Sequence, residues 1–369
     1  MRVRTQLKDI ASFSKGAQIN GDELVENGKY DYLNGGITPS GKWNEYNTPG
    51  GTVTISEGGN SCGYVNYMRN PFWCGAHCYY LFDTISDTEY LYYMLKSQQD
   101  RLMKIRTGAC MPNIKKADLG SFELEYDTDV EKQQLVVSTL KRVEAIITAR
   151  HSQLSALDDL IKARFVEMFG DPMPAWPLVT IGDICADTRT GPFGSALHHD
   201  EFVNEGIFVL GIDNAVENKF SYSRMRYITE VKYQQLKRYT VHPGDVIITI
   251  MGTIGRSAVI PEDMPLAINT KHLACLTPDY SKASSVFLCS AFQMHPEVQR
   301  QLTGNAKGAI MDGLNLGIIK SLRFRLPPMQ AQKDFELFYA HIDKSKSVIK
   351  KSLEGTQILF DSLMQKYFG

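Results

Sequence analysis

The stretch DVEKQQLVVSTLKRVEAIITARHSQLSALDDLIKARFVEMFG, Asp129–Gly170, decides how this chain is organised because its pattern occurs twice. The segment Pro328–Gly369 repeats it without a gap at a shift of 199 residues, so that Val130 corresponds to Met329 and Gly170 to Gly369. The last residue of the chain therefore matches the end of the first copy.

Both copies carry an apolar seam with alternating spacings of four and three, which is typical of helices in coiled-coil packing. The first seam contains Val136, Leu140, Val143, Ile147, Leu154, Leu157, Ile161 and Met168. The second contains Phe335, Tyr339, Ile342, Leu353, Thr356, Phe360 and Tyr367, with Lys346 as one charged break. At 1.5 Å per residue each copy predicts a helix roughly 60 Å long, and we expect the two to pack antiparallel.

Start signals precede both helices. Thr128 and Glu131 predict a capping box at the first, and Pro327 and Pro328 stand at the start of the second, where a missing N–H costs nothing. Outside the seam, the apolar residues Ile146, Leu160 and Phe165 have no evident partner within the chain, so we expect its solubility to depend on other subunits.

The composition indicates an ordinary globular chain of two or three domains, with 369 residues, 43% hydrophobic content and a net charge of −1. No apolar run is long enough for a membrane span, and the N-terminus lacks the apolar core of a signal peptide. Seven cysteines without a framework spacing favour reduced thiols, and hence a cytoplasmic protein.

The near-zero net charge conceals two basic runs, Lys96–Lys116 and Lys219–Arg256, each with an excess of five positive charges. Tyrosines interleave with the second run, a pattern that favours contact with phosphates. An ordinary solvated surface explains the runs equally well.

A β-rich segment precedes each long helix, and the two segments share a framework. The first has expected strands at 52–56 and 77–82 and a helix at 89–103. The second has strands at 245–250 and 272–276 and a helix at 285–302. His77–Leu81 corresponds to His272–Leu276 at a shift of 195, whereas the turns differ completely. Two segments with the same framework but different loops predict two related domains that recognise different targets.

Candidate catalytic and metal sites are weak. Gly36–Lys42 has the spacing of a phosphate-binding loop, but Trp43 replaces the magnesium-binding hydroxyl. Cys62, Cys74, His77 and Cys78 could bind zinc, but the second copy keeps only the histidine. We therefore predict no catalytic residues, no metal and no cofactor.

In this arrangement the chain resembles the specificity (S) subunits of type I restriction-modification enzymes. The local matches are Leu326–Gln332 (Leu-Pro-Pro-x-x-x-Gln), Gly191–Ser195, Gly244–Ile247 and Lys162–Phe165. The resemblance implies an α+β fold in which two β-rich target-recognition domains form a pseudo-twofold repeat and are separated by two long antiparallel helices in a coiled coil. We place the recognition domains at 1–128 and 171–327, the central helix at 129–170 and the C-terminal helix at 328–369.

The resemblance also implies a non-catalytic, cytoplasmic DNA reader. Each domain of such a subunit reads half of a bipartite site in double-stranded DNA, and the helices fix the gap. Methyltransferase (M) and motor-nuclease (R) subunits supply the chemistry, and no membrane is involved. Two alternatives stay open: a specificity module of another restriction-methylation assembly, and a coiled-coil scaffold without a DNA role.

The loops expected to face DNA are 34–42 and 57–61 in the first domain, and 189–199, 219–226 and 252–256 in the second. Lysine and arginine there should mostly hold phosphates, while Asn60, Ser40, Asn214 and Arg226 are predicted to reach base edges. The full predicted set is Asn34, Ser40, Lys42, Asn60, Ser61, Arg189, Ser195, Asn214, Lys219, Arg224, Arg226 and Arg256.

Overall fold

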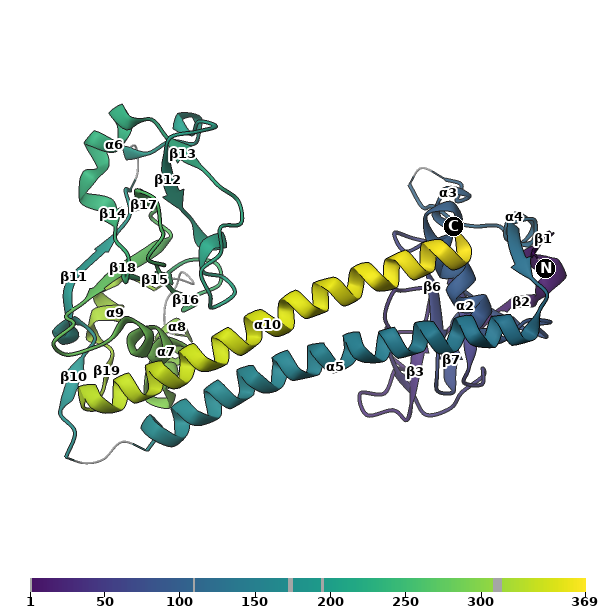
Figure 1. The fold of residues 1–369 in the computed structure, drawn as a ribbon, viewed down its shortest axis with the longest axis horizontal. Coiled ribbons are helices and arrows are strands. Elements are labelled where there is room, and N and C mark those ends of the chain that lie inside the picture. The colour runs from purple at the N-terminus through teal and green to yellow at the C-terminus, as the bar shows by residue number, and fades with distance from the viewer. Residues whose placement is uncertain (1, 109, 172–174, 194–195, 308–313) are drawn as a thin grey trace. The chain divides into compact units, whose positions relative to one another are not determined.

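A computed structural model describes residues 2–108, 110–171, 175–193, 196–307 and 314–369. The chain forms two compact units, Met1–Ser152 with Lys350–Gly369 (unit 1) and Gln153–Ile349 (unit 2). Each unit combines β-sheets with helices, which confirms the α+β class (Figure 1). Among the described residues, no helix combines the length and the apolar character that a membrane crossing requires.

The two long helices have nearly the predicted bounds. Helix α5 spans Val130–Phe169 and α10 spans Met329–Phe368. Because α5 begins at Val130, its cap is Asp129, whose Oδ1 accepts a hydrogen bond from the Lys132 backbone N–H at 3.2 Å. The predicted capping role of Thr128 is therefore wrong by one residue. Both helices contribute residues to both units.

Unit 1 contains two larger sheets and one two-stranded ribbon. The ribbon pairs β1 with β9 antiparallel, one sheet has the order β2-β8-β5-β6, and the other has the order β4-β3-β7. Its strands are β1 (Arg2–Gln6), β2 (Ser12–Lys15), β3 (Tyr30–Leu33), β4 (Gly41–Trp43), β5 (Thr52–Ser56), β6 (Val65–Met68), β7 (Phe72–Cys74), β8 (Cys78–Phe82) and β9 (Glu123–Asp127). Its short helices are α1 (Leu7–Ile10), α2 (Thr88–Ser97), α3 (Gln99–Lys104) and α4 (Lys116–Gly120).

Unit 2 repeats this design. The ribbon pairs β10 with β19, and the sheets have the orders β11-β18-β15-β16 and β13-β12-β17-β14. Its strands are β10 (Leu178–Thr180), β11 (Cys185–Thr190), β12 (Ile207–Leu210), β13 (Tyr227–Ile228), β14 (Thr240–Val241), β15 (Val246–Thr249), β16 (Ser257–Val259), β17 (Ala267–Asn269), β18 (Leu273–Pro278) and β19 (Arg323–Arg325). Its short helices are η1 (Gly182–Ile184), η3 (His199–Glu201), η4 (Ile212–Asn214), α6 (Glu230–Leu236), η5 (Lys237–Tyr239), α7 (Ser285–Met294), α8 (Pro296–Lys307) and α9 (Leu316–Ser321).

The expected framework segments occupy equivalent places in the two sheets. Strand β5 coincides with the predicted 52–56, and it corresponds to β15 of unit 2. The helix expected at 285–302 is divided into α7 and α8 because Pro296 lacks the N–H that a continuous helix would need. The helix expected at 89–103 is likewise divided, at Gln98.

In each unit, parts of the two long helices pack antiparallel against the domain core. In unit 1, Leu140 of α5 and Phe368 of α10 join the core beneath α2, and Figure 1 shows the last turns of α10 beside α2 and α3. In unit 2, Phe165 of α5 lies 5.2 Å, ring centre to ring centre, from Phe335 of α10. The seam residues Leu140 in unit 1 and Ile161 and Phe335 in unit 2 are thus part of the domain cores. Phe165 is fully buried, so the prediction that it lacks a partner is wrong, whereas Ile146 and Leu160 are exposed.

The charged break in the seam also has a partner within unit 2. Lys346 of α10 forms an ion pair with Asp158 of α5, and its side chain is only 15% exposed. The long aliphatic stem of a lysine can cover apolar surface while its ammonium group is satisfied by a carboxylate. Lys346 is therefore compatible with the seam that it interrupts.

A buried glutamine fastens the first turn of each long helix to its domain. Gln133 accepts a hydrogen bond from the Asp87 N–H at 3.0 Å and donates one to the Asp127 carbonyl at 2.7 Å. Gln332, the equivalent residue at the shift of 199, accepts from the Ser284 N–H at 3.0 Å. Since both side chains are completely buried, these bonds fix where each helix begins relative to α2 or α7.

Candidate nucleic-acid interface

In both units, two loops meet at the carboxyl ends of a parallel strand pair. Strand β3 pairs with β7 in unit 1, and β12 pairs with β17 in unit 2. The same backbone hydrogen bond closes each pair, from Gly75 to the Leu33 carbonyl and from Thr270 to the Leu210 carbonyl, both at 2.9 Å. Ligands commonly bind where loops leave the carboxyl ends of parallel strands.

A third loop joins each pair through another shared bond. Glu57 donates its backbone N–H to the His77 carbonyl at 2.9 Å, and Ile250 donates to the His272 carbonyl at 3.0 Å. We define the first loop cluster as residues 34–36, 57–61 and 75–77, and the second as residues 211–214, 251–256 and 270–272 together with Arg226, which pairs with Asp213. The two clusters have the same backbone frame and different side chains.

The first loop cluster brings together two segments that the sequence predicted separately. Ser61 donates its hydroxyl to the Gly35 carbonyl at 2.6 Å, and Ser56 bonds to the same carbonyl. Asn34 accepts a hydrogen bond from the His77 N–H at 3.2 Å. Asn34 and Ser61 therefore lie in one cluster, and the exposed Asn60 belongs to the same loop.

A carboxylate organises the charges of this cluster. Glu57, whose side chain is 13% exposed, pairs with Lys15 of β2, and its Oε2 lies 3.3 Å from the Nδ1 of His77. His77 itself is largely exposed. The cluster thus offers serine, asparagine and histidine groups that can donate or accept hydrogen bonds.

Ser40 and Lys42 lie on the neighbouring β3–β4 hairpin. Ser40 is exposed, and its backbone N–H bonds to the Tyr32 carbonyl at 2.8 Å. Lys42 is half-exposed and its Nζ lies 3.6 Å from a carboxylate oxygen of Asp31. An ion pair this exposed contributes about 0–1 kcal/mol, so Lys42 can exchange its carboxylate for a phosphate at little cost.

The second loop cluster centres on Arg226 and Asp213. The Arg226 guanidinium pairs with the Asp213 carboxylate, and the two side chains are 24% and 37% exposed. A Cβ on Gly211 would lie 2.4 Å from Nη1 of Arg226, so the absence of a side chain at 211 makes room for the guanidinium. Burial, and then the positive charges of Lys271 and Arg226, lower the pKa of His272 below its usual value.

Two predicted DNA-contacting residues of unit 2, Arg189 and Asn214, bond to partners within the domain. Arg189 is 12% exposed and pairs with Asp245, which is 1% exposed. Removing one partner of such a buried pair typically costs about 3–5 kcal/mol. Asn214 is fully buried, and its amide accepts from the Gly211 N–H at 2.8 Å and donates to the Ser221 carbonyl at 2.7 Å. The polar groups of both side chains are thus engaged within unit 2, which favours the more exposed predicted residues as DNA contacts.

The remaining predicted residues of unit 2 are scattered. Arg224 is exposed and has a positive φ of 56°. Arg256 is exposed at the end of the second loop cluster. Lys219 extends toward α10, where its Nζ lies 2.7 Å from Asp343. Ser195 falls outside the described residues.

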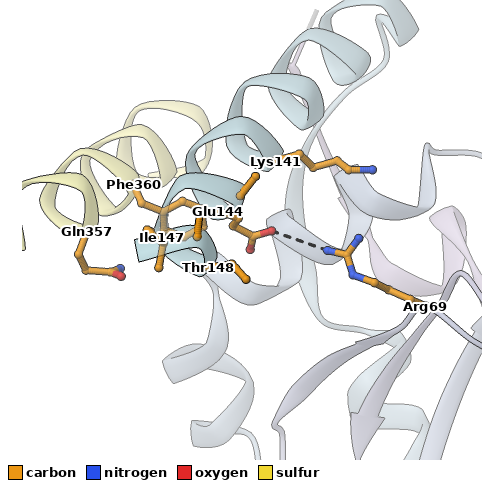
Figure 2. Close-up of a pocket in the computed structure, with 9 residues that line it drawn as sticks. Arg69, Lys141, Glu144, Ile147, Thr148, Gln357 and Phe360 are labelled. Atoms are coloured by element: carbon orange, nitrogen blue, oxygen red, sulfur yellow. Dashed lines mark ion pairs between the residues drawn. The ribbon is translucent and has the colours of Figure 1, made fainter. Parts of the chain in front are cut away.

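A pocket in unit 1 lies along the long helices. It has a volume of about 810 Å³ and is lined mainly by residues of α5 and α10 together with Arg69. Figure 2 shows Glu144 pointing toward Arg69, and the ion pair between them has a length of 4.0 Å. Lys141 of the same helix pairs with Glu89 of α2 at 2.8 Å. Glu144 corresponds to Asp343 at the shift of 199, so each domain places a cation against the same acidic position of a long helix.

Sequence reasoning missed the carboxylates Glu57 and Asp213 and the histidines at the cluster centres. One signal was available, because His77 and His272 match at the shift of 195. Nothing in the sequence pairs Asp213 with Arg226. Among the described residues, no group of three or more His, Cys, Asp or Glu side chains is placed to hold a metal ion.

A family model described as the type I restriction modification DNA specificity domain matches residues 3–157 and 175–354 of the chain. A putative type I specificity subunit of Mycoplasma genitalium is 33% identical over 141 residues, which are 37% of each protein. The specificity subunit of the EcoBI type I restriction enzyme of Escherichia coli is 24% identical over 197 residues, 52% of this chain and 41% of that protein. The matched segments thus span less than half the length of these curated relatives.

Two solved structures share the fold. One is the crystal structure of the S subunit of a type I restriction-modification system from M. genitalium, with a TM-score of 0.66 and 21% identity, covering 100% of this chain and 96% of that one. The other comes from work on complex assembly and conformational transition of the type I restriction-modification system. Its TM-score is 0.60 at 12% identity, covering 99% and 97% of the two chains.

Proposed function

The chain belongs to the family of type I restriction modification DNA specificity domains, and on that premise we propose that it is the non-catalytic DNA-recognition subunit of a type I restriction-modification complex. Each recognition domain reads one half of a bipartite site in double-stranded DNA. The long helices fix the unread gap between the halves. The domain scheme we propose is 1–128 and 171–327 for the two readers, and 129–170 and 328–369 for the helices.

The observation that carries this proposal is the pair of loop clusters. The two clusters lie on equivalent strands and are closed by equivalent backbone hydrogen bonds. The first cluster presents Asn34, Ser61 and His77, whereas the second presents Asp213 and Arg226. Direct readout depends on the donors and acceptors that reach base edges. Two equal frames with different polar groups therefore suit two different half-sites.

Partner subunits complete the proposed assembly. Methyltransferase subunits supply methylation, motor-nuclease subunits supply ATP-driven translocation and cleavage, and the complex acts in the cytoplasm. Partners also account for the net charge of −1, because they can provide much of the positive surface around the DNA. The purified chain alone should have no methylation, cleavage or ATPase activity.

The proposed DNA-contacting set is Asn34, Ser40, Lys42, Asn60 and Ser61 in the first domain, and Ser195, Lys219, Arg224, Arg226 and Arg256 in the second. Arg226 is the strongest candidate for a base contact because a guanidinium can bond to guanine at two atoms. Lysines in the set serve phosphates, which orient the duplex without reading its sequence.

Selection from a randomised duplex library tests the proposal. The full chain should enrich a bipartite sequence, and binding to the enriched duplex should exceed binding to a scrambled duplex at every salt concentration. Arg226→Ala should lower the information content of one half-site and leave the other half intact. Equal weakening of both halves, or of neither, would contradict the assignment of Arg226.

The same selection separates the alternatives. A coiled-coil scaffold would enrich no sequence and would bind scrambled duplex only as strongly as its charge dictates. A specificity module of another restriction-methylation assembly would enrich a site but would not associate with both methyltransferase and motor-nuclease subunits, which co-purification detects.

A further inference from the structure

The ion pair between Arg226 and Asp213 is more exposed than the pair between Arg189 and Asp245 in the same unit. The Arg226 and Asp213 side chains are 24% and 37% exposed, whereas Asp245, the partner of Arg189, is 1% exposed. Water reaches the first pair and screens it, so its partners can separate. The buried pair has no such freedom.

The surroundings of Arg226 allow its side chain to change partner while the backbone stays in place. Gly211 has no side chain, so the guanidinium lies directly against its backbone, where a Cβ would be 2.4 Å from Nη1, and no side chain at 211 holds it there. Asn214 holds the loop that carries Asp213 through bonds to the Gly211 N–H and the Ser221 carbonyl. Val209 of β12 donates to the Arg226 carbonyl at 2.9 Å. The movable part is thus the arginine side chain alone.

A carboxylate held against this arginine competes with every other acceptor. A DNA phosphate is anionic, so the Asp213 carboxylate repels it in addition to competing with it for the guanidinium, whereas a guanine edge carries no net charge. A guanine offers two acceptors in the geometry that a guanidinium fits. Asp213 therefore disfavours non-specific phosphate contacts more than it disfavours the specific base contact.

We propose that Asp213 is a specificity-determining residue of the second domain, which it serves by holding Arg226 until a matching base edge replaces the carboxylate. The inference rests on the proposed DNA-recognition function and adds a residue whose contribution is negative: it suppresses binding to the wrong DNA. Asp213 is a positioning and competing group that need not touch the DNA.

Asp213→Asn in the full chain tests this inference, with Asp187→Asn as the matched control. Asp187 is also an exposed aspartate of unit 2, but its partner Arg189 stays held by Asp245 when the charge is removed. Each variant is titrated with a scrambled duplex and with the duplex enriched by the wild type, over a series of salt concentrations. The bound fraction of a randomised library is also sequenced.

Asp213→Asn should raise affinity for the scrambled duplex by about three- to ten-fold and steepen the salt dependence by about one phosphate contact. Affinity for the enriched duplex should rise less, so the specificity ratio falls, and only one half-site should lose information. Asp187→Asn should change the scrambled affinity by less than about two-fold, since its lost charge frees no arginine.

Two results would overturn the inference. If Asp213→Asn and Asp187→Asn raise the scrambled affinity equally, only net charge matters and Asp213 has no special role. If the wild type enriches a site and Asp213→Asn keeps the full specificity ratio, Arg226 is not restrained by Asp213. A wild type that enriches no sequence would instead overturn the proposed function, and this inference with it.

Discussion

Replacing Gln332 by leucine removes the three hydrogen bonds that this buried side chain makes. Its Oε1 accepts from the Ser284 N–H at 3.0 Å, and its Nε2 donates to the carbonyls of Lys282 and Pro327, both at 2.9 Å. The side chain is fully buried, so water does not replace these bonds readily. Leucine occupies a similar volume, so the change removes polarity rather than packing.

The expected loss of stability is large for the replacement of a single buried side chain. Leaving a buried donor or acceptor without a partner costs about 1–3 kcal/mol each, and three such groups give about 3–5 kcal/mol once some relaxation is allowed. A domain is typically stable by about 5–15 kcal/mol. Unit 2 of the Gln332→Leu variant should therefore be folded but marginal.

Hydrogen exchange followed by mass spectrometry measures this effect unit by unit. Peptides from the start of α7 should exchange about 10²- to 10³-fold faster, since each 1.4 kcal/mol corresponds to a factor of ten. Gln133→Leu should do the same to the start of α2 in unit 1 and leave α7 unchanged. Gln330→Ala is the matched control, because Gln330 is exposed and its amide donates to Asp334, a neighbour on the same helix, at 2.9 Å.

The reasoning would be refuted if Gln332→Leu exchanged no faster than Gln330→Ala. That outcome would mean that the three backbone groups find other partners, and that the buried glutamine is a consequence of helix docking rather than a cause of it.

Two further predictions concern the long helices and the acid stability of unit 2. Four residues inserted after Ala149 lengthen α5 by about 6 Å. If the helices set the gap between the half-sites, the methylated half-sites should stay the same while their spacing grows by about one or two base pairs. An unchanged spacing with full activity would show that the helices do not set the gap. Hydrogen bonds from the Ser281 hydroxyl, from Lys282 and from the Ser281 N–H lower the pKa of Asp279 to about 2, whereas its unfolded value is about 4. This carboxylate therefore stabilises the fold above about pH 4, and the stabilisation is lost as the pH falls toward about 2. Asp279→Asn should accordingly be less stable than wild type at neutral pH and lose less stability on acidification, which thermal unfolding at a series of pH values measures; parallel curves for the two proteins would contradict it.

The sequence alone determined the features that depend on local pattern. The repeat at a shift of 199 placed both long helices to within a residue, at Val130–Phe169 and Met329–Phe368, because helical periodicity is a property of consecutive residues. Strand β5 was predicted from the β-branched residues of Thr52–Ser56, which are likewise a local feature of the sequence. The resemblance to the family rested on the order of these segments along the chain, which can be read directly from the sequence.

Tertiary structure decided what each polar side chain does. Arg189 and Arg226 read alike in the sequence, but folding buries the first against Asp245, 56 residues away, and leaves the second half-exposed beside Asp213. The Asn214 side chain is hydrogen-bonded to backbone groups of its own loop, and Phe165 packs against aromatic rings of α7 and α10. Such pairings depend on which distant segments meet and on how much water stays between them. Local periodicity encodes neither quantity, so only the folded chain separates the side chains that hold the frame from those that stay exposed.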